Sequence, residues 1–201
     1  MEPTDINRRA FDDLHRRRRR PSSGLPPIVK ATLGDLTEKR VLHLHAARGG
    51  GSAELAEQGA VVTAVDPDEL ALDAAREQWP SILWVHGDAQ QLPAELRRGR
   101  FDLVYSPEAT LWQLGDLDAW AANVVAALGP HGELLVYETH PVALCVDGLQ
   151  RWHHDYFAEG FWRLGKIVMA LIRAGFRIEA LEEYPGERRL PGTFLLYARR
   201  A

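Results

Sequence analysis

Acidic residues and glycines that directly follow short apolar segments are the part of this sequence best suited to bind a nucleotide-like ligand. Asp66 ends the segment VVTAVD, Asp88 follows ILWVHG, and three glycines at 49–51 follow VLHLH (41–45). A carboxylate at a strand end can accept hydrogen bonds from both ribose hydroxyls, and a glycine loop leading into a helix presents backbone amides to an anion. The spacing predicts that residues 41–66 form the ligand-cradling part of a Rossmann-like fold.

Histidines offer a second kind of chemistry. His43 and His45 share one face of a strand by alternation, and His140 ends a later apolar segment just before Pro141. A metal site is disfavoured against core or loop histidines, because no acidic partner joins them in sequence and the single cysteine, Cys145, excludes a cysteine-based zinc cluster. We expect no metal. His140 is a candidate general base, and the alternative is a structural role.

The elements that must position these residues are predicted from apolar periodicity and turn residues. Strands are predicted at 41–45, 61–65, 82–86, 101–105, 133–138, 176–183 and 193–198. Helices are predicted at 52–58 with Ser52 as N-cap, from Pro67 to before Pro80, at 116–128 and at 161–174. Only a loop, 184–192, joins the last two strands, so they should pair antiparallel. This order predicts a Rossmann-like, doubly wound α/β fold whose seven-stranded sheet is mostly parallel and ends in an antiparallel hairpin.

The N-terminal region differs from the rest in composition. Residues 1–20 could form a basic helix, and PSSGLPP (21–27) reads as a linker, which divides the chain into an extension at 1–35 and a domain at 36–201. Five arginines run from Arg16 to Arg20. They could form a phosphate-binding arm, but a solvated helix end is favoured because no aromatic residues interleave the run.

Composition restricts the setting of the protein. The chain has 201 residues and a formal net charge of −4, which gives no global reason to expect nucleic acid as a partner. No apolar run approaches the roughly 20 residues that span a bilayer, and the first residues lack the apolar core of a signal peptide. We expect a cytoplasmic protein without membrane contact, either a monomer or a homodimer.

The order of elements and several segments resemble the class I S-adenosylmethionine-dependent methyltransferases over residues 36–201. The resemblance is to a small bacterial branch whose first strand reads VLHL. The segments that carry it are VLHL (41–44), FDLVY (101–105), DLDAW (116–120), GPHGELLVYETHPV (129–142), LGKIVMALIRAGFRIEALEEYP (164–185) and LPGTFLLYARR (190–200). It implies S-adenosylmethionine as cofactor and methyl transfer to a small molecule.

The resemblance also implies site residues. Asp66 would bind the ribose hydroxyls, with helix capping as the alternative, and Asp88 would bind the adenine amino group, with turn stabilisation as the alternative. The full set implied for the cofactor is His45, Ala46, Gly49, Gly50, Asp66, Pro67, Asp88, Ala89, Gln90 and Ser106. Residues 141–160 suggest an ordered loop or lid. Candidates for the acceptor pocket are Glu108, His153, His154 and Tyr156, with lid packing as the alternative for the last three.

The sequence departs from the family pattern at its first motif. His43 stands where most of the superfamily has an acid, and His45 and Ala47 replace two glycines. Alanine methyl groups could crowd the cofactor, whereas Arg48 could pair with its carboxylate. These departures leave a non-catalytic protein with a methyltransferase fold as an alternative. An RNA-modifying methyltransferase is another, although the N-P-P-Y-type run of amino-group methylation is missing. A nicotinamide-dependent reductase is disfavoured because no G-x-G-x-x-G follows the first strand.

Overall fold

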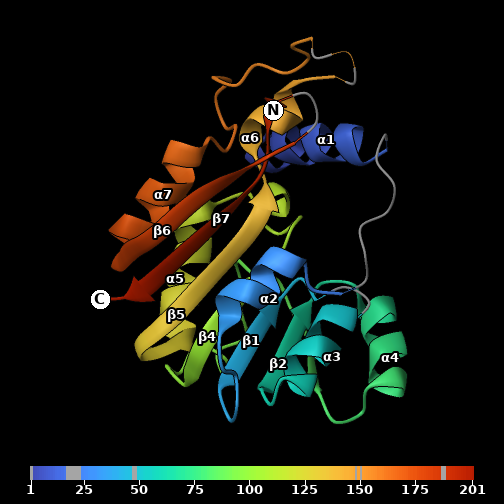
Figure 1. Cartoon of the computed structure of the whole chain (residues 1–201), viewed down its shortest axis with the longest axis vertical. Coiled ribbons are helices and arrows are strands. Elements are labelled where there is room, and N and C mark those ends of the chain that lie inside the picture. The colour runs from blue at the N-terminus through green and yellow to red at the C-terminus, as the bar shows by residue number, and fades with distance from the viewer. Residues whose placement is uncertain (1, 17–23, 47–48, 148, 150, 187–188) are drawn as a thin grey trace.

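A seven-stranded sheet in the order β3-β2-β1-β4-β5-β7-β6 forms the centre of the computed structural model (Figure 1). The structure describes residues 2–16, 24–46, 49–147, 149, 151–186 and 189–201. The strands are β1 (Arg40–Leu44), β2 (Val61–Asp66), β3 (Leu83–His86), β4 (Phe101–Ser106), β5 (Leu128–Thr139), β6 (Phe176–Pro185) and β7 (Pro191–Arg200). Strands β1 to β5 pair in parallel, and β7 pairs antiparallel with both β5 and β6. The predicted fold class is confirmed.

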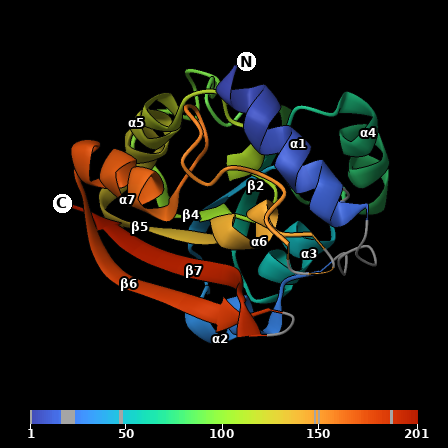
Figure 2. The ribbon, with the colours of Figure 1, turned by 90° about the horizontal axis from the view of Figure 1, so that it is seen from above.

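Helices cover both faces of the sheet. They are α1 (Pro3–His15), α2 (Pro27–Leu33), α3 (Gly50–Glu57), α4 (Glu69–Gln78), the 3₁₀ helix η1 (Leu111–Gln113), α5 (Leu117–Ala127), α6 (Pro141–Cys145) and α7 (Leu164–Arg173). Alternation along β1 sends Leu42 and Leu44 into a core with α1, α5 and α7, and Val41 into a second core with α2, α3 and α4. Figure 2 shows these two helix layers on either side of the sheet.

Three predicted helix starts were wrong, and one of them is that of α7, which begins at Leu164 instead of residue 161. The N-cap of α3 is Gly49, and Ser52 lies buried inside the helix. The helix after β2 begins at Glu69, because the Asp68 carboxylate caps it by accepting hydrogen bonds from the amides of Leu70 and Ala71. In addition, β5 starts at Leu128, earlier than predicted, so the segment GPHG belongs to the strand.

Helix α1 crosses above the carboxyl-terminal ends of the strands, against α6 and η1 (Figures 1 and 2). Asn7 is fully buried and joins α1 to a distant loop: its side chain donates to the carbonyl of Gly160 at 2.9 Å and accepts from the amide of Trp162 at 2.8 Å. The expected N-terminal helix is thus observed over Pro3–His15. The arginines at 17–20 lie outside the described residues, and the domain division at 35 stays a prediction.

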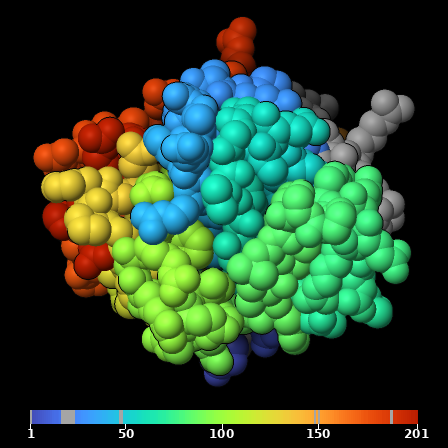
Figure 3. Space-filling model, turned by 90° about the horizontal axis from the view of Figure 1, so that it is seen from below, coloured from blue at the N-terminus to red at the C-terminus, as the bar shows by residue number. Residues whose placement is uncertain are grey.

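The opposite end of the molecule carries the amino-terminal ends of the parallel strands. Figure 3 views this end, with residues 34–39 in blue beside the cyan and green surface of α3 and α4. In parallel α/β sheets the ligand site lies at the carboxyl-terminal end of the strands. We therefore expect the ligand site beneath α1.

Candidate functional site

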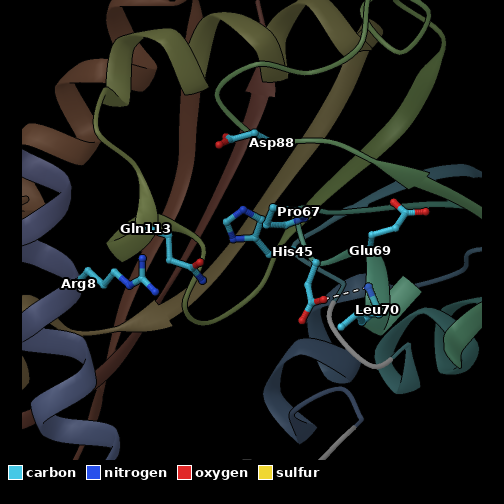
Figure 4. A pocket seen from close by; sticks show the side chains of 8 residues that line it. Arg8, His45, Pro67, Glu69, Leu70, Asp88 and Gln113 are labelled. Atoms are coloured by element: carbon cyan, nitrogen blue, oxygen red, sulfur yellow. Dashed lines mark hydrogen bonds between the residues drawn. The ribbon is translucent and has the colours of Figure 1, made fainter. Parts of the chain in front are cut away.

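A cavity of about 550 Å³ lies at the carboxyl-terminal ends of β1, β2 and β3 (Figure 4). Its lining comes from five segments far apart in the sequence. The lining residues are Arg8, His45, Pro67, Asp68, Glu69, Leu70, Asp88 and Gln113. In Figure 4, Arg8 from α1 and Gln113 from η1 face the β2–α4 turn across His45. This is the position at which Rossmann-like sheets hold a nucleotide-like ligand.

The loop from β1 to α3 is shaped by packing and backbone conformation. His45 and Gly49 both adopt positive φ, at 43° and 85°. A Cβ atom on Gly49 would lie 2.7 Å from the rings of Trp79 and Trp84, so this position requires glycine for two reasons. The expected crowding by Ala47 and the expected ion pair of Arg48 lie outside the described residues.

His43 stands at the position where most of the resembled superfamily has an acidic residue. Its Nδ1 lies 2.7 Å from the hydroxyl of Ser52, and the ring is buried beneath Gly51. Burial, with a smaller contribution from His45, lowers the pKa of His43 to about 3. A neutral histidine and a serine therefore join β1 to α3, and His43 lies outside the cavity lining.

His45 brings a polar ring to the cavity. Burial lowers the pKa of His45, and the carboxylates of Asp66 and Asp88 partly oppose that shift. Its Nδ1 is buried and has no hydrogen-bond partner within the described residues. A buried imidazole nitrogen without a partner is costly unless a ligand supplies one, so His45 fits a site for a polar ligand.

The acidic residues of the cavity serve the backbone as well. Asp66 is buried, and its Oδ1 accepts a hydrogen bond from the amide of Asp68 at 2.9 Å, which stabilises the turn before α4, whereas the N-cap of α4 is Asp68 itself. Asp88 lines the cavity while its Oδ1 accepts from the amide of Gln90 at 2.8 Å. The carboxylate of Glu69 is paired with Arg76 at 2.8 Å. Among the residues that the structure describes, Asp68 and Asp88 of the lining form no ion pair with a cation.

The structure brings together only part of the predicted cofactor set. His45, Pro67 and Asp88 line the cavity. Gln90 instead accepts hydrogen bonds from the amides of Gly115 and Asp116, at 2.8 and 2.9 Å, and so holds the start of α5. The remaining predicted residues are not among the lining residues: Ala46, Gly49, Gly50, Asp66, Ala89 and Ser106. Their contact with a cofactor stays a prediction.

Five residues of the cavity lining were not predicted from the sequence. They are Arg8, Asp68, Glu69, Leu70 and Gln113. The two acids follow the predicted strand end at Asp66, so extending that motif by three residues would have found them. Nothing in the sequence places Arg8 or Gln113 near this motif, because their proximity depends on how α1 and η1 pack.

The adjoining edge, formed by β4 and β5, holds a buried acid. Glu138 is fully buried and accepts backbone hydrogen bonds from Ala109, Leu111 and Thr139, at 3.0, 3.2 and 2.7 Å. Burial raises the pKa of Glu138 well above its usual range, and the nearby carboxylate of Glu108 adds to that shift. Ala109 has a φ of 83°, a strained conformation for a residue with a side chain. Glu138 therefore fixes the strained turn after β4.

His140 is held by a hydrogen bond at one ring nitrogen, and the other nitrogen lies close to Glu183 without forming a hydrogen bond with the described residues. Its Nδ1 accepts a hydrogen bond from the amide of Val142 at 3.1 Å, and its Nε2 lies 2.8 Å from Oε1 of Glu183. Burial lowers the pKa of His140, and Glu183 opposes the shift. In this arrangement Nδ1 uses its lone pair and Nε2 carries the proton, so the ring acts as the cap of α6. The base role stays a prediction.

The predicted acceptor-pocket residues do not line the cavity of Figure 4. The Glu108 carboxylate accepts a hydrogen bond from the hydroxyl of Thr139. His153 and His154 turn toward Asp13 of α1, with Nε2 to Oδ2 distances of 3.8 and 3.2 Å. Tyr156 lines a separate hollow of about 430 Å³ beside α7. Their role in an acceptor pocket stays a prediction, with lid packing as the alternative for His153, His154 and Tyr156.

Comparisons with known proteins identify the family. Residues 41–132 match the model of a family described as "Methyltransferase domain". A crystal structure of an S-adenosylmethionine-dependent methyltransferase from Mesorhizobium loti matches with a TM-score of 0.76 and 28% identity, over 87% of this chain and 96% of that one. This chain belongs to the class I S-adenosylmethionine-dependent methyltransferase superfamily. The predicted family is confirmed, and S-adenosylmethionine is the cofactor of this superfamily.

Two curated relatives are longer than this chain. The phthiotriol/phenolphthiotriol dimycocerosates methyltransferase of Mycobacterium leprae is 30% identical over 145 residues, which are 70% of this chain and 48% of that protein. The biotin biosynthesis bifunctional protein BioHC of Cellvibrio japonicus is 35% identical over 96 residues, which are 45% of this chain and 19% of that protein. The chain thus spans about half or less of these relatives.

A membrane-spanning helix is not among the helices that the structure describes in this methyltransferase-fold chain. The cytoplasmic location and the monomeric or homodimeric state stay predictions.

Proposed function

We propose that this chain binds S-adenosylmethionine in the cavity between α1 and the β2–α4 turn and transfers its methyl group to a small molecule. The charge of the lining carries the proposal: Asp68 and Asp88 are acidic, and Arg8 is a cation that faces the β2–α4 turn across His45 (Figure 4). S-adenosylmethionine has a sulfonium and an ammonium group together with one carboxylate. The arrangement of charges around the cavity is complementary to those groups.

Each part of the cofactor has a residue type suited to it. We assign the adenine amino group to Asp88 and the face of the adenine ring to Leu70, because Leu70 is 82% exposed and offers an apolar surface to a planar base. The ribose hydroxyls belong with the turn of Asp66 and Asp68, at the end of β2. Arg8 suits the carboxylate, since a guanidinium forms charge-assisted hydrogen bonds with it.

The protein's part in the chemistry is chiefly positioning. When bound, S-adenosylmethionine supplies the electrophilic methyl group. The residues of this chain hold the reactants in line and exclude water, which α1 does by covering the strand ends. Because the Nδ1 lone pair of His140 accepts a hydrogen bond from the amide of Val142, we propose that acceptors with an already nucleophilic atom are preferred.

A small molecule is the proposed acceptor. The Mycobacterium leprae relative is named for a methyl transfer to phthiotriol-type compounds, which are not macromolecules. An RNA substrate would be favoured by a run of basic residues interleaved with aromatic ones, and the described residues contain no such run. This supports a small acceptor for this chain as well.

The test is calorimetric titration of the full chain with S-adenosylhomocysteine, followed by transfer of a labelled methyl group to a panel of small acceptors. We expect binding, and a weakening of about tenfold or more in Asp88→Asn, since a hydrogen bond to a charged group contributes about 1.5–3 kcal/mol. Asp73→Asn is the matched control, because Asp73 lies on the exposed side of α4 outside the lining.

The two stages separate the alternatives. No binding by a folded chain would refute the cavity as the cofactor site. Binding without transfer to any acceptor would favour the non-catalytic alternative over the proposed enzyme.

A further inference from the structure

We propose that Asp13, His153 and His154 form a binding site for a divalent transition-metal ion of the zinc class, which fastens α1 to the loop before α7. Within the described residues these three side chains place one ligand atom each within 4.8 Å of one another. They come from segments some 140 positions apart in the chain. Neither the family comparison nor the proposed cofactor site uses them, so the inference stands apart from both.

The distances are close to those of an occupied site. Oδ2 of Asp13 lies 3.2 Å from Nε2 of His154 and 3.8 Å from Nε2 of His153. With zinc bonds of roughly 2.0–2.2 Å, ligand atoms in a tetrahedral site lie about 3.4 Å apart. The exposed His153 ring can turn to shorten its distance, because its side chain is 53% exposed. Two imidazoles and one carboxylate leave the fourth position for water.

The backbone and a neighbouring arginine already orient the three ligands. The amides of His153 and His154 both donate to the carbonyl of Cys145, at 2.7 and 3.2 Å, which presents consecutive side chains on one side of the loop. Their rings meet at 77° with centroids 4.7 Å apart. Arg16 binds Oδ1 of Asp13 at 2.6 Å, so Oδ2 remains directed at the histidines. Such hydrogen bonding of a ligating carboxylate is usual in metal sites.

The ligand types indicate the class of ion. Imidazole suits zinc, copper, iron and nickel, whereas magnesium and calcium prefer oxygen ligands alone. A bound ion would tie α1, which carries Arg8 of the cavity, to the segment that follows α6. The alternative is a metal-free contact in which His154 and Asp13 simply share a hydrogen bond.

The experiment is calorimetric titration of the tag-free full chain, stripped with a chelator, with zinc chloride. We expect one equivalent to bind, and the affinity to fall at least tenfold in His153→Ala and in His154→Ala. His131→Ala is the matched control, because His131 is exposed and lies on the other end of β5. Since His153 is exposed, its replacement should leave the fold intact, which circular dichroism checks.

A second readout reports on the tether. Zinc should increase the protection of the α1 amides in hydrogen exchange for the unchanged chain and leave it unaltered in His153→Ala. Failure of stoichiometric binding, or equal affinity in the unchanged chain and in the His153→Ala/His154→Ala double variant, overturns the proposal. Neither measurement uses S-adenosylhomocysteine, so the outcome is independent of the proposed methyltransferase function.

Discussion

The carboxyl-terminal ends of β1, β2 and β3, here called the first edge, present polar side chains to a cavity. The carboxyl-terminal ends of β4 and β5, the second edge, instead bind the protein's own backbone with their polar side chains. At the first edge, His45 and Asp88 face the space beneath α1. At the second, Glu138 and His140 are bound to the amides of the turn after β4 and of α6. The first edge is therefore ready for a ligand, and we expect the second to open only when α1 moves.

Replacing Glu138 should have the largest effect on stability and should show that the second edge is structural. In Glu138→Ala the amides of Ala109 and Leu111 lose their acceptor. Leaving buried donors without partners predicts a loss of about 3 kcal/mol or more in the free energy of unfolding, measured with urea. Glu57→Ala, an exposed change on α3, is the control. A loss no larger than the control's would mean that this edge does not depend on Glu138.

Asn7→Ala tests the closure over the second edge. It removes the hydrogen bonds that join α1 to Gly160 and Trp162. We expect a loss of about 2 kcal/mol in the free energy of unfolding, because the backbone groups stay buried without partners. Amides of α1 should also exchange faster, whereas those of β1 should not. Arg9→Ala, an exposed change on the same helix, should leave the stability and the exchange rates unaltered. Unchanged amide exchange of α1 in Asn7→Ala would contradict the proposal that Asn7 holds α1 in place.

The pH dependence of stability distinguishes the buried histidine of the first edge. His43 has a pKa of about 3 in the folded protein and about 6.5 when unfolded. Above pH 6.5 it is neutral in both states; below that, only the unfolded state gains the proton, so stability falls until about pH 3. The slope approaches about 1.4 kcal/mol per pH unit, or about 2 kcal/mol between pH 6.5 and 5.

The measurement is urea unfolding at those two pH values for the unchanged chain and for His43→Asn. We expect the variant to lose most of this difference, and His131→Asn, at an exposed position, to retain it. An equal pH effect in His43→Asn and the unchanged chain would assign the acid sensitivity to other groups.

The sequence was sufficient for the sheet because its signals are local. Apolar strand segments, the turn residues between them and the short 184–192 connection predicted the seven strands and the antiparallel hairpin. The start of α3 was not predictable to the residue, because three consecutive glycines can each begin a helix. The cap is Gly49, whose φ of 85° and tight packing beneath Trp79 are tertiary features.

The site was predictable only where its residues belong to one motif. His45, Pro67 and Asp88 follow strand ends and were found. Arg8 was not, because its place in the cavity depends on α1 packing across the sheet. The contact of Asp13 with His154 joins residues 141 positions apart, and no local pattern reports it. Long-range packing of polar residues is thus the part that the sequence left open.

Leu70→Ser is the smallest change in stability and the sharpest test of the first edge. Leu70 is 82% exposed at the cavity, so we expect the free energy of unfolding to change by no more than about 0.5 kcal/mol. Affinity for S-adenosylhomocysteine should nevertheless fall about tenfold, since burying a leucine against a ligand contributes about 1.5 kcal/mol. Leu83→Ser, at an exposed position on β3 outside the lining, should leave the affinity unchanged.

The two edges are compared directly by measuring both stability and cofactor affinity in Leu70→Ser and in Glu138→Ala. A substitution at a preformed ligand site lowers the affinity without lowering the free energy of unfolding. A substitution at a structural position lowers the free energy of unfolding first. If Leu70→Ser destabilised the fold as strongly as Glu138→Ala, the exposed leucine would have to be packed in solution. The first edge would then be as closed as the second, and cofactor entry would also require α1 to move.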